Sequence, residues 1–450
     1  MLARSSSPRL VRITLLTLVA VALGLSAPDA QLFRATDPGV RGGGAGAGGP
    51  IAGLTARQLE YFQMGKDEFE EVETVGDGLG PRMNLDSCAG CHAQPATGGT
   101  SPAVNPQVAF GSAGAGAVPF FIRLNGPVRE ARFPYKRDGS RDGGVHNTAA
   151  ITGRAGAAGC VLALPDFGAE AARNNLAFRI PTPVFGSGLI EALADSAIAA
   201  NLAANVTLKS HFGISGRLNS NGNDGTVTRF GWKAQNKSLL LFSGEAYNVE
   251  MGITSDLFQT EREEKPDCQL APVPNTFADP EVASTPDGLS AIEKFAFFQR
   301  LLAPPAPSAT SPGGSASIGR GRTLFASVGC ALCHTPSLKT GDNQVAALKF
   351  QTLYLFSDLA LHAMGPGLAD DILQGAARGD EFRTAPLWGL GKRIFFLHDG
   401  RTSNLIEAIQ AHRSGGNAKF GPSEANAVVG NYNQLTEPQK QDLLNFLRSL

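Results

Sequence analysis

The pattern of apolar and polar positions along the chain predicts three long helices. Each opens with a capping box, in which Ser or Thr is followed three residues later by Glu or Gln. The boxes begin at Thr55, Ser290 and Thr436. Behind the last two boxes the apolar residues recur at helical spacing. These residues are Ile292, Phe295, Phe298 and Leu302, followed in the last helix by Leu443, Phe446, Leu447 and Leu450.

A weak internal repeat connects two distant parts of the chain. Gly-x-x-x-Phe occurs from Gly65 to Phe69 and again from Gly321 to Phe325, and each copy precedes a Cys-x-x-Cys-His sequence. The shared order predicts a helix that leads into a loop of the same kind in both places. The Pro/Ser/Gly-rich run "APPAPSATSPGGSAS" lies between the copies and is typical of a linker.

The N-terminus has the pattern of a secretory signal peptide. Three arginines come first, the apolar run "ITLLTLVAVALGL" follows, and "SAPDA" supplies small residues for cleavage. The apolar run is shorter than the roughly 20 residues of a membrane span, so we expect an exported protein with no span once the signal is removed. The next stretch, "RGGGAGAGGP", has little side chain to pack and predicts a flexible leader.

These signals divide the chain into five parts. At 450 residues it has room for two or three domains of roughly 150 residues each. We expect a signal peptide at 1–30, a flexible leader at 31–52, an N-terminal domain at 53–302, a linker at 303–315 and a C-terminal domain at 316–450.

Composition excludes one class of partner. Lys plus Arg number 39 and Asp plus Glu number 40, so the chain lacks the basic excess that nucleic acid attracts. Glycine is frequent, at 54 residues, and charged residues are only 18% of the chain, against about 25% in ordinary domains. We expect much loop and no nucleic-acid partner.

Four of the six cysteines stand in two Cys-x-x-Cys-His sequences. The pairs are Cys88 with Cys91 and Cys330 with Cys333, each followed at once by a histidine. This is the attachment signature of c-type haem, in which two thiols bind one edge of the porphyrin and the adjacent His lies under the iron. A zinc site built from both pairs is the alternative. We expect two covalently bound haem c groups.

Three other stretches resemble the bacterial di-haem cytochrome c peroxidase superfamily, and most closely its di-haem oxidoreductase branch of peroxidases or thiol oxidoreductases. They are "RTAPLWGLGKRIFFLHDGRTSNLIEAIQAH", "RFGWKAQNKSLLLF" and "AYNVEMGIT". The resemblance covers nearly all of the chain after the signal peptide. It implies a mainly α fold of two cytochrome c-like haem domains, with a loop-rich, insertion-bearing N-terminal domain, in a periplasmic or secreted bacterial protein.

The resemblance also implies the iron ligands. His92 and His334 match the proximal ligands of the N-terminal and C-terminal haems. His412 lies where relatives place the sixth ligand of the C-terminal haem, usually a Met, and His362 and Met364 are the competing candidates. Imidazole on both faces would give a low-spin haem with a lower potential than a His/Met pair gives.

Four more residues match positions with a role in the superfamily. Trp232 falls where relatives have a Trp between the haems, and resembles an electron conduit. Glu250 matches the distal Glu over the N-terminal haem, where a carboxylate can take a proton from peroxide and return it to the leaving oxygen. His398 and Asp399 are expected to orient propionates or loops rather than to bind iron.

The chain departs from the superfamily pattern at two places. Relatives that need reductive activation carry a distal His soon after the first haem sequence, but here the next one is His146. Either the N-terminal haem is open at rest or His146 reaches it from another loop. Arg179, in "FRIPTP", stands near the Asn that helps to bind calcium in relatives, which makes a bound calcium ion uncertain.

Cys160 and Cys268 are left outside the haem sequences. In an exported protein two leftover cysteines are expected to pair, and closing so long a loop stabilises by about 4–5 kcal/mol in the chain-entropy model.

Three functions are compatible with these residues. The first is a peroxide-dependent di-haem oxidoreductase, with the N-terminal haem as reaction site and the C-terminal haem as electron relay from an external donor such as a small cytochrome or a cupredoxin. The second is an electron-transfer cytochrome without catalysis. The third is a haem oxygenase acting on an apolar substrate. Glu250 favours the first over the third, because O₂ binding does not call for an acid/base group.

Overall fold

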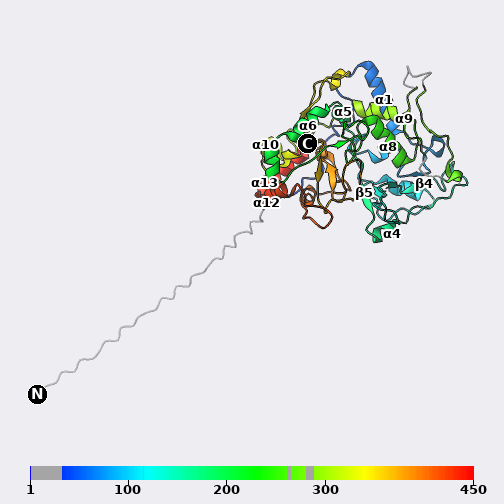
Figure 1. The fold of residues 1–450 in the computed structure, drawn as a ribbon. Coiled ribbons are helices and arrows are strands. Elements are labelled where there is room, and N and C mark those ends of the chain that lie inside the picture. The colour runs from blue at the N-terminus through cyan, green and yellow to red at the C-terminus, as the bar shows by residue number, and fades with distance from the viewer. Residues whose placement is uncertain (2–32, 115, 261–264, 280–287) are drawn as a thin grey trace. The chain divides into compact units, whose positions relative to one another are not determined.

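The computed structural model describes Met1 and residues 33–114, 116–260, 265–279 and 288–450. The predicted signal peptide at 1–30 lies, apart from Met1, outside the described residues. Residues 35–450 form one compact unit (Figure 1). Among the described residues, no helix is both long enough and apolar enough to cross a membrane.

Helices carry most of the regular structure. The α-helices are α1 (Ala56–Glu70), α2 (Cys88–Cys91), α3 (Pro106–Ser112), α4 (Phe167–Ala172), α5 (Ser187–Glu191), α6 (Asp195–Ala203), α7 (Val206–His211), α8 (Leu239–Met251), α9 (Ala291–Leu301), α10 (Gly314–Ser327), α11 (Leu405–Ala411), α12 (Asn426–Gln434) and α13 (Glu437–Ser449). Short 3₁₀ helices are η1 (Val75–Asp77), η2 (Pro266–Cys268), η4 (Cys330–Leu332), η5 (Ala346–Leu348) and η6 (Leu390–Lys392). All three predicted capping boxes are present, at the starts of α1, α9 and α13.

The strands have only two or three residues each and form small antiparallel sheets. They are β1 (Arg82–Met83), β2 (Glu130–Arg132), β3 (Val145–His146), β4 (Ala149–Ala150), β5 (Ala177–Arg179), β6 (Asn219–Ser220), β7 (Val227–Thr228), β8 (Leu338–Lys339), β9 (Thr352–Leu353), β10 (Leu361–Ala363) and β11 (Glu381–Arg383). The pairs are β1–β4, β6–β7, β8–β9 and β10–β11, and β2 pairs with both β3 and β5. Long loops join these pieces, as the glycine content predicts.

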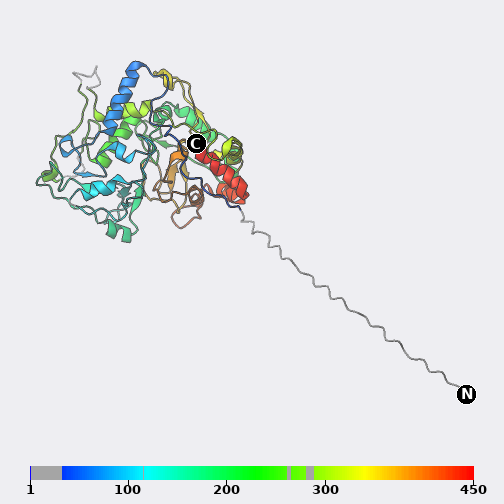
Figure 2. The ribbon, with the colours of Figure 1, turned by 180° about the vertical axis from the view of Figure 1, so that it is seen from behind.

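The predicted internal repeat corresponds to two helix pairs, α1 with α9 and α10 with α13, which lie apart from each other in both views (Figures 1 and 2). At Gly65 an added Cβ would lie 2.2 Å from the carbonyl oxygen of Lys294 on α9. At Gly321 it would lie 2.0 Å from the carbonyl oxygen of Asp442 on α13. Each glycine therefore allows two helix backbones to touch.

Each helix pair builds its own apolar core. Around α1, α8 and α9 the core includes Phe62, Phe69, Phe295 and Phe298. Around α10, α11, α12 and α13 it includes Phe325, Leu405, Tyr432 and Phe446. The phenylalanine of each repeat also contacts the histidine of its Cys-x-x-Cys-His sequence: ring centroids are 5.8 Å apart for Phe69 and His92, and 6.4 Å apart for Phe325 and His334.

The part of the predicted flexible leader that begins at residue 35 differs from expectation, because it packs along the C-terminal part. Asp37 forms a buried ion pair with Arg448 of α13 at 2.7 Å. The Lys392 ammonium donates to the carbonyl oxygens of Gly42 and Gly43 at 3.0 and 2.9 Å. Backbone carbonyls and one carboxylate thus supply the contacts that small side chains cannot.

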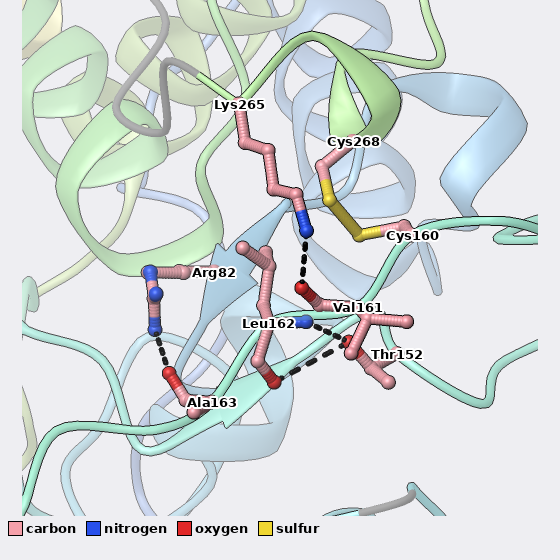
Figure 3. Close-up of a disulfide and its surroundings, with 8 residues drawn as sticks. All are labelled: Arg82, Thr152, Cys160, Val161, Leu162, Ala163, Lys265 and Cys268. Atoms are coloured by element: carbon pink, nitrogen blue, oxygen red, sulfur yellow. Dashed lines mark hydrogen bonds between the residues drawn. A yellow bond between two sulfur atoms is a disulfide. The ribbon is translucent and has the colours of Figure 1, made fainter.

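Cys160 and Cys268 form the expected disulfide, with Cα atoms 4.7 Å apart (Figure 3). The segment after Cys160 is held on both sides. Lys265 donates to the carbonyl oxygen of Val161 at 2.8 Å, and Arg82 of β1 donates to that of Ala163 at 2.9 Å. The bridge therefore ties η2 to the loop that lies beside β1.

Candidate functional site

The first Cys-x-x-Cys-His sequence lines a cavity. Cys88 and Cys91 on α2 and the adjacent His92 lie on its wall, and Glu250 and Met251 at the end of α8 also line it.

A backbone carbonyl orients His92. The Nδ1 atom of His92 lies 2.9 Å from the carbonyl oxygen of Gly99. A carbonyl can only accept, so Nδ1 carries the proton and Nε2 keeps a free electron pair. Burial lowers the pKa of His92 to about 4, which keeps the ring neutral. This is the state that a metal ligand requires.

The second Cys-x-x-Cys-His sequence lines another cavity. His334 donates from Nδ1 to the carbonyl oxygen of Phe356 at 3.0 Å, as His92 does to Gly99. His412 lines the same cavity, and its Nδ1 donates to the carbonyl oxygen of Ala408 at 2.7 Å. Two neutral imidazoles, each with a free Nε2, therefore share this cavity.

The two competing candidates for the sixth ligand differ in their contacts. His362 also lines the second cavity, but its Nε2 lies 3.0 Å from Asp358 Oδ2 and its Nδ1 lies 2.7 Å from Glu424 Oε2. Both ring nitrogens are therefore engaged. Met364 lines the cavity and packs with Leu368.

Trp232 lines both cavities. Its indole Nε1 donates to the carbonyl oxygen of Ile180 at 2.9 Å, which fixes the ring between them. His398 lies beside it with ring centroids 6.3 Å apart, and itself stacks on Phe382 at 4.2 Å. Asp399 is paired with Arg401 at 2.7 Å and lines neither cavity.

Glu250 is a carboxylate of the first cavity whose pKa is strongly raised. Burial and the nearby charge of Glu130 raise the pKa, Arg132 lowers it, and the result is a pKa of about 8. Among the described residues its carboxylate has no hydrogen-bond partner, so it is free to bind a group within the cavity. A pKa close to neutral lets a group take up a proton and return it.

His146 does not line the first cavity. Its Nε2 lies 3.1 Å from Asp142 Oδ2, and its ring stacks on Phe133 with centroids 3.8 Å apart. Of the two possibilities left by the sequence, the structure therefore favours a first cavity without a second imidazole.

At the place expected for calcium, Arg179 donates to Asp370 Oδ2 at 2.7 Å and to Gln374. Lys233 donates to the other carboxylate oxygen of Asp370 at 2.8 Å. Two cations thus already neutralise the carboxylate that could attract a metal ion.

The side chains of both cavities fit a haem. The two cysteine pairs lie in separate cavities, each beside a neutral His, and no cluster of three or more metal-ligating side chains occurs in the part of the chain that the structure describes. This separation argues against a zinc site shared by both pairs.

A second observation comes from Arg383 and Arg393, which line the second cavity. Burial lowers the pKa of each to about 10, and neither forms an ion pair within the described residues. Buried cations need a counter-charge, which haem propionates would supply.

Sequence reasoning missed these two arginines, although they stand in "RTAPLWGLGKR" beside residues that carry the resemblance. It also missed Tyr247, which lines the first cavity and donates to Glu73. No local pattern distinguishes such residues from ordinary surface or core positions.

Comparison with known proteins gives one family match. The family model described as "Di-haem oxidoreductase, putative peroxidase" matches residues 172–450. No curated protein matches the chain.

Several solved structures are similar at low identity. A diheme peroxidase variant, BthA Y463M from Burkholderia thailandensis E264, has 15% identity and a TM-score of 0.40, covering 92% of each chain. Hydrazine synthase from Kuenenia stuttgartiensis has 14% identity and a TM-score of 0.35, covering 93% of this chain and 99% of that one. A MauG-like protein associated with microbial copper homeostasis has 18% identity and a TM-score of 0.30, covering 60% and 90%. Likenesses this distant carry no conclusion about activity.

Proposed function

Because the chain belongs to the di-haem oxidoreductase family, we propose that it is an exported, peroxide-dependent oxidoreductase. The N-terminal haem would be the reaction site, and the C-terminal haem would relay electrons from an external donor, a small cytochrome or a cupredoxin. The observation that supports this division is the difference between the two cavities. The wall of the first includes one histidine, His92, and the acid Glu250. The wall of the second includes four histidines, among them His334 and His412, which face the same cavity.

The haem-holding residues follow from the two cavity walls. Cys88, Cys91 and His92 would hold one haem c, and Cys330, Cys333 and His334 the other. Arg383 and Arg393 would neutralise propionates of the second haem. When bound, the haems would supply the iron centres that exchange electrons and, at the first cavity, reduce peroxide.

Glu250 is proposed to move the proton at the first cavity. Its ionised form takes a proton from hydrogen peroxide, and its protonated form returns that proton to the departing oxygen, so that water leaves. A pKa of about 8 allows both forms near neutral pH. An electron carrier without catalysis has no need of an unpartnered acid at this place.

The haem of the second cavity is proposed to transfer electrons and not to bind substrate. His334 and His412 would both hold the second haem through their free Nε2 atoms, and that haem would supply electron exchange. Trp232, which lines both cavities, is the proposed path between them. Calcium is not needed by this proposal.

The proposal is tested by mixing the resting holoprotein with hydrogen peroxide and following the haem absorbance by stopped flow. We expect a reaction without prior reduction. Glu250→Gln keeps the side-chain shape but cannot exchange the proton, so the rate should fall by roughly 10²–10⁴.

The matched control is Glu170→Gln, which changes a buried carboxylate of α4 that lines neither cavity. Its rate should equal that of the unchanged protein. Equal rates for Glu250→Gln would remove Glu250 from the mechanism. Two low-spin haems that do not react with peroxide would leave the electron carrier as the function.

A further inference from the structure

Tyr247 on α8 lies between the first cavity and a hollow at the protein surface. It lines the cavity together with Cys88 and His92. It also lines the hollow, together with Glu68, Glu71, Glu73 and Asp77. The tyrosine itself is only 4% exposed. A single buried side chain therefore separates the candidate reaction site from the surface.

The phenol of Tyr247 has a carboxylate as its partner. Its hydroxyl donates to Glu73 Oε1, and Glu73 is only 7% exposed. Two buried polar groups joined in this way satisfy each other. The carboxylate is also in position to accept the phenolic proton, a step that favours the loss of an electron from a tyrosine.

Aromatic rings connect Tyr247 with the proximal histidine of the first cavity. The centroid of Tyr247 lies 5.0 Å from that of Phe295, and Phe295 lies 5.9 Å from Phe69. Phe69 in turn lies 5.8 Å from His92. Tyr247 thus contacts the first site both directly, as part of the cavity wall, and through packed rings.

We propose that Tyr247 is an oxidisable site, with Glu73 as its proton acceptor. The phenol gives one electron to the first haem site after that site has been oxidised by peroxide. Its O–H bond breaks, and the proton moves to the Glu73 carboxylate, which leaves a neutral tyrosyl radical and a protonated Glu73. Tyr247 supplies one of the two electrons that one peroxide consumes. This proposal rests on the proposed function, which supplies the oxidant.

The second cavity offers a natural comparison. Tyr432 lines that cavity and is 2% exposed, but its hydroxyl is buried without a hydrogen-bond partner among the described residues. Loss of an electron from Tyr432 would therefore leave a proton with no base to accept it. The two buried tyrosines differ in this respect, so the radical should form on Tyr247 and not on Tyr432.

The proton acceptor makes the radical yield depend on pH. Burial raises the pKa of Glu73, the hydrogen bond from Tyr247 lowers it, and the charges of Glu71, Glu68 and Asp77 raise it, with a pKa of about 7 as the result. On the side of α9, Lys294 is paired with Glu68 at 2.8 Å. Glu73 is protonated below its pKa and cannot accept a proton there, so the yield should rise as the pH increases through about 7.

The test is electron paramagnetic resonance of the holoprotein, frozen after mixing with hydrogen peroxide, with haem absorbance recorded on the same samples. We expect an organic radical signal that narrows when the protein contains ring-deuterated tyrosine. Tyr247→Phe should remove the signal and Tyr432→Phe should retain it. Glu73→Gln can still accept the hydrogen bond but not the proton, so it should lower the yield at least tenfold and abolish its pH dependence.

The outcomes separate the two proposals. A haem reaction without a tyrosyl signal, or a signal that persists in Tyr247→Phe, would overturn the assignment of Tyr247 and leave the peroxide reaction intact. An unchanged yield in Glu73→Gln would remove Glu73 as the acceptor. If no sample reacts with peroxide, the proposed function fails and this inference fails with it. The haem content and spectra of the resting protein identify any variant that does not fold. If Tyr247→Phe does not fold, Glu73→Gln still tests the Tyr247–Glu73 pair, because it leaves Tyr247 unchanged.

Discussion

Individual side chains make the two cavities chemically different. Each has a histidine fixed by a backbone carbonyl, His92 by Gly99 and His334 by Phe356. The difference lies in what else lines the cavity, which is Glu250 in the first and His412 in the second. Reactivity is therefore expected at the first cavity, where Glu250 is available as an acid and His92 is the histidine on the wall.

Replacing His412 tests its assignment as the sixth ligand. His412→Ala should convert the low-spin spectrum of the C-terminal haem to a high-spin one and leave the spectrum of the N-terminal haem unchanged, because only the second cavity loses an imidazole. Electronic absorption and paramagnetic resonance of the resting protein measure this. His211→Ala is the control, because His211 lines neither cavity. An unchanged spectrum in His412→Ala would transfer the role to Met364 or His362.

Sequence reasoning located the residues of both sites that belong to a local pattern. The Cys-x-x-Cys-His sequences are short, so their chemistry can be inferred without a fold. Arg383, Arg393 and the pair of Tyr247 with Glu73 could not be found in this way. Their meaning depends on burial and on contacts between distant segments, as the sequence separation of 174 positions from Glu73 to Tyr247 illustrates.

At the level of elements, the Gly-x-x-x-Phe repeat has one structural role in both halves. The glycine lets two helices touch, and the phenylalanine four residues later contacts the histidine of the haem sequence. The helix starts were predictable because capping boxes are local. The packing of the leader was not, because its partners lie more than 300 residues away.

Gly321→Ala tests the close approach of α10 and α13. The new methyl group would meet the backbone of Asp442, so the helices must separate, and we expect a loss of about 1–3 kcal/mol in unfolding free energy. Gly319→Ala is the matched control on the same helix, because nothing lies within 4 Å of an added Cβ there. It should stabilise the protein by up to about 1 kcal/mol through helix propensity. Thermal unfolding measures the change in stability of both variants. Equal changes in Gly321→Ala and Gly319→Ala would contradict a close contact between α10 and α13.

On the scale of the whole molecule, a buried group of charges connects the two halves. Asp370 accepts from Arg179 at 2.7 Å and from Lys233 at 2.8 Å, and all three side chains are buried. Arg179 and Lys233 lie before the predicted linker at 303–315, and Asp370 lies after it. The carboxylate therefore neutralises two cations that would otherwise be buried alone.

Asp370→Asn should destabilise the protein by about 3–5 kcal/mol, because it leaves two buried cations without a counter-charge. Burial raises the pKa of Asp370, but Arg179 and Lys233 outweigh it and hold the pKa at about 2, below the ordinary value of 3.8. The ionised Asp370 therefore stabilises the fold fully above pH 3.8, and this contribution is lost as the pH falls through about 2.

Denaturant unfolding between pH 2 and pH 7 measures both effects. Asp371→Asn is the neighbouring control, since its partners Arg141 and Lys419 are exposed, and it should cost about 1 kcal/mol or less. Similar losses for the two variants would mean that the buried group does not hold the halves together.

The anchored leader also sets an order of assembly. A chain that emerges from its N-terminus presents Asp37 long before Arg448 exists, and these partners are 411 residues apart. Contacts of such long sequence separation form late, because the chain between them must first be ordered. All the elements around the first cavity lie before the linker, whereas the wall of the second cavity reaches to Leu447 of the last helix. If the thiols attach haem as proposed, the first pair could receive its haem while the chain is still incomplete, and the second pair would stay accessible until the last helix has docked on the leader.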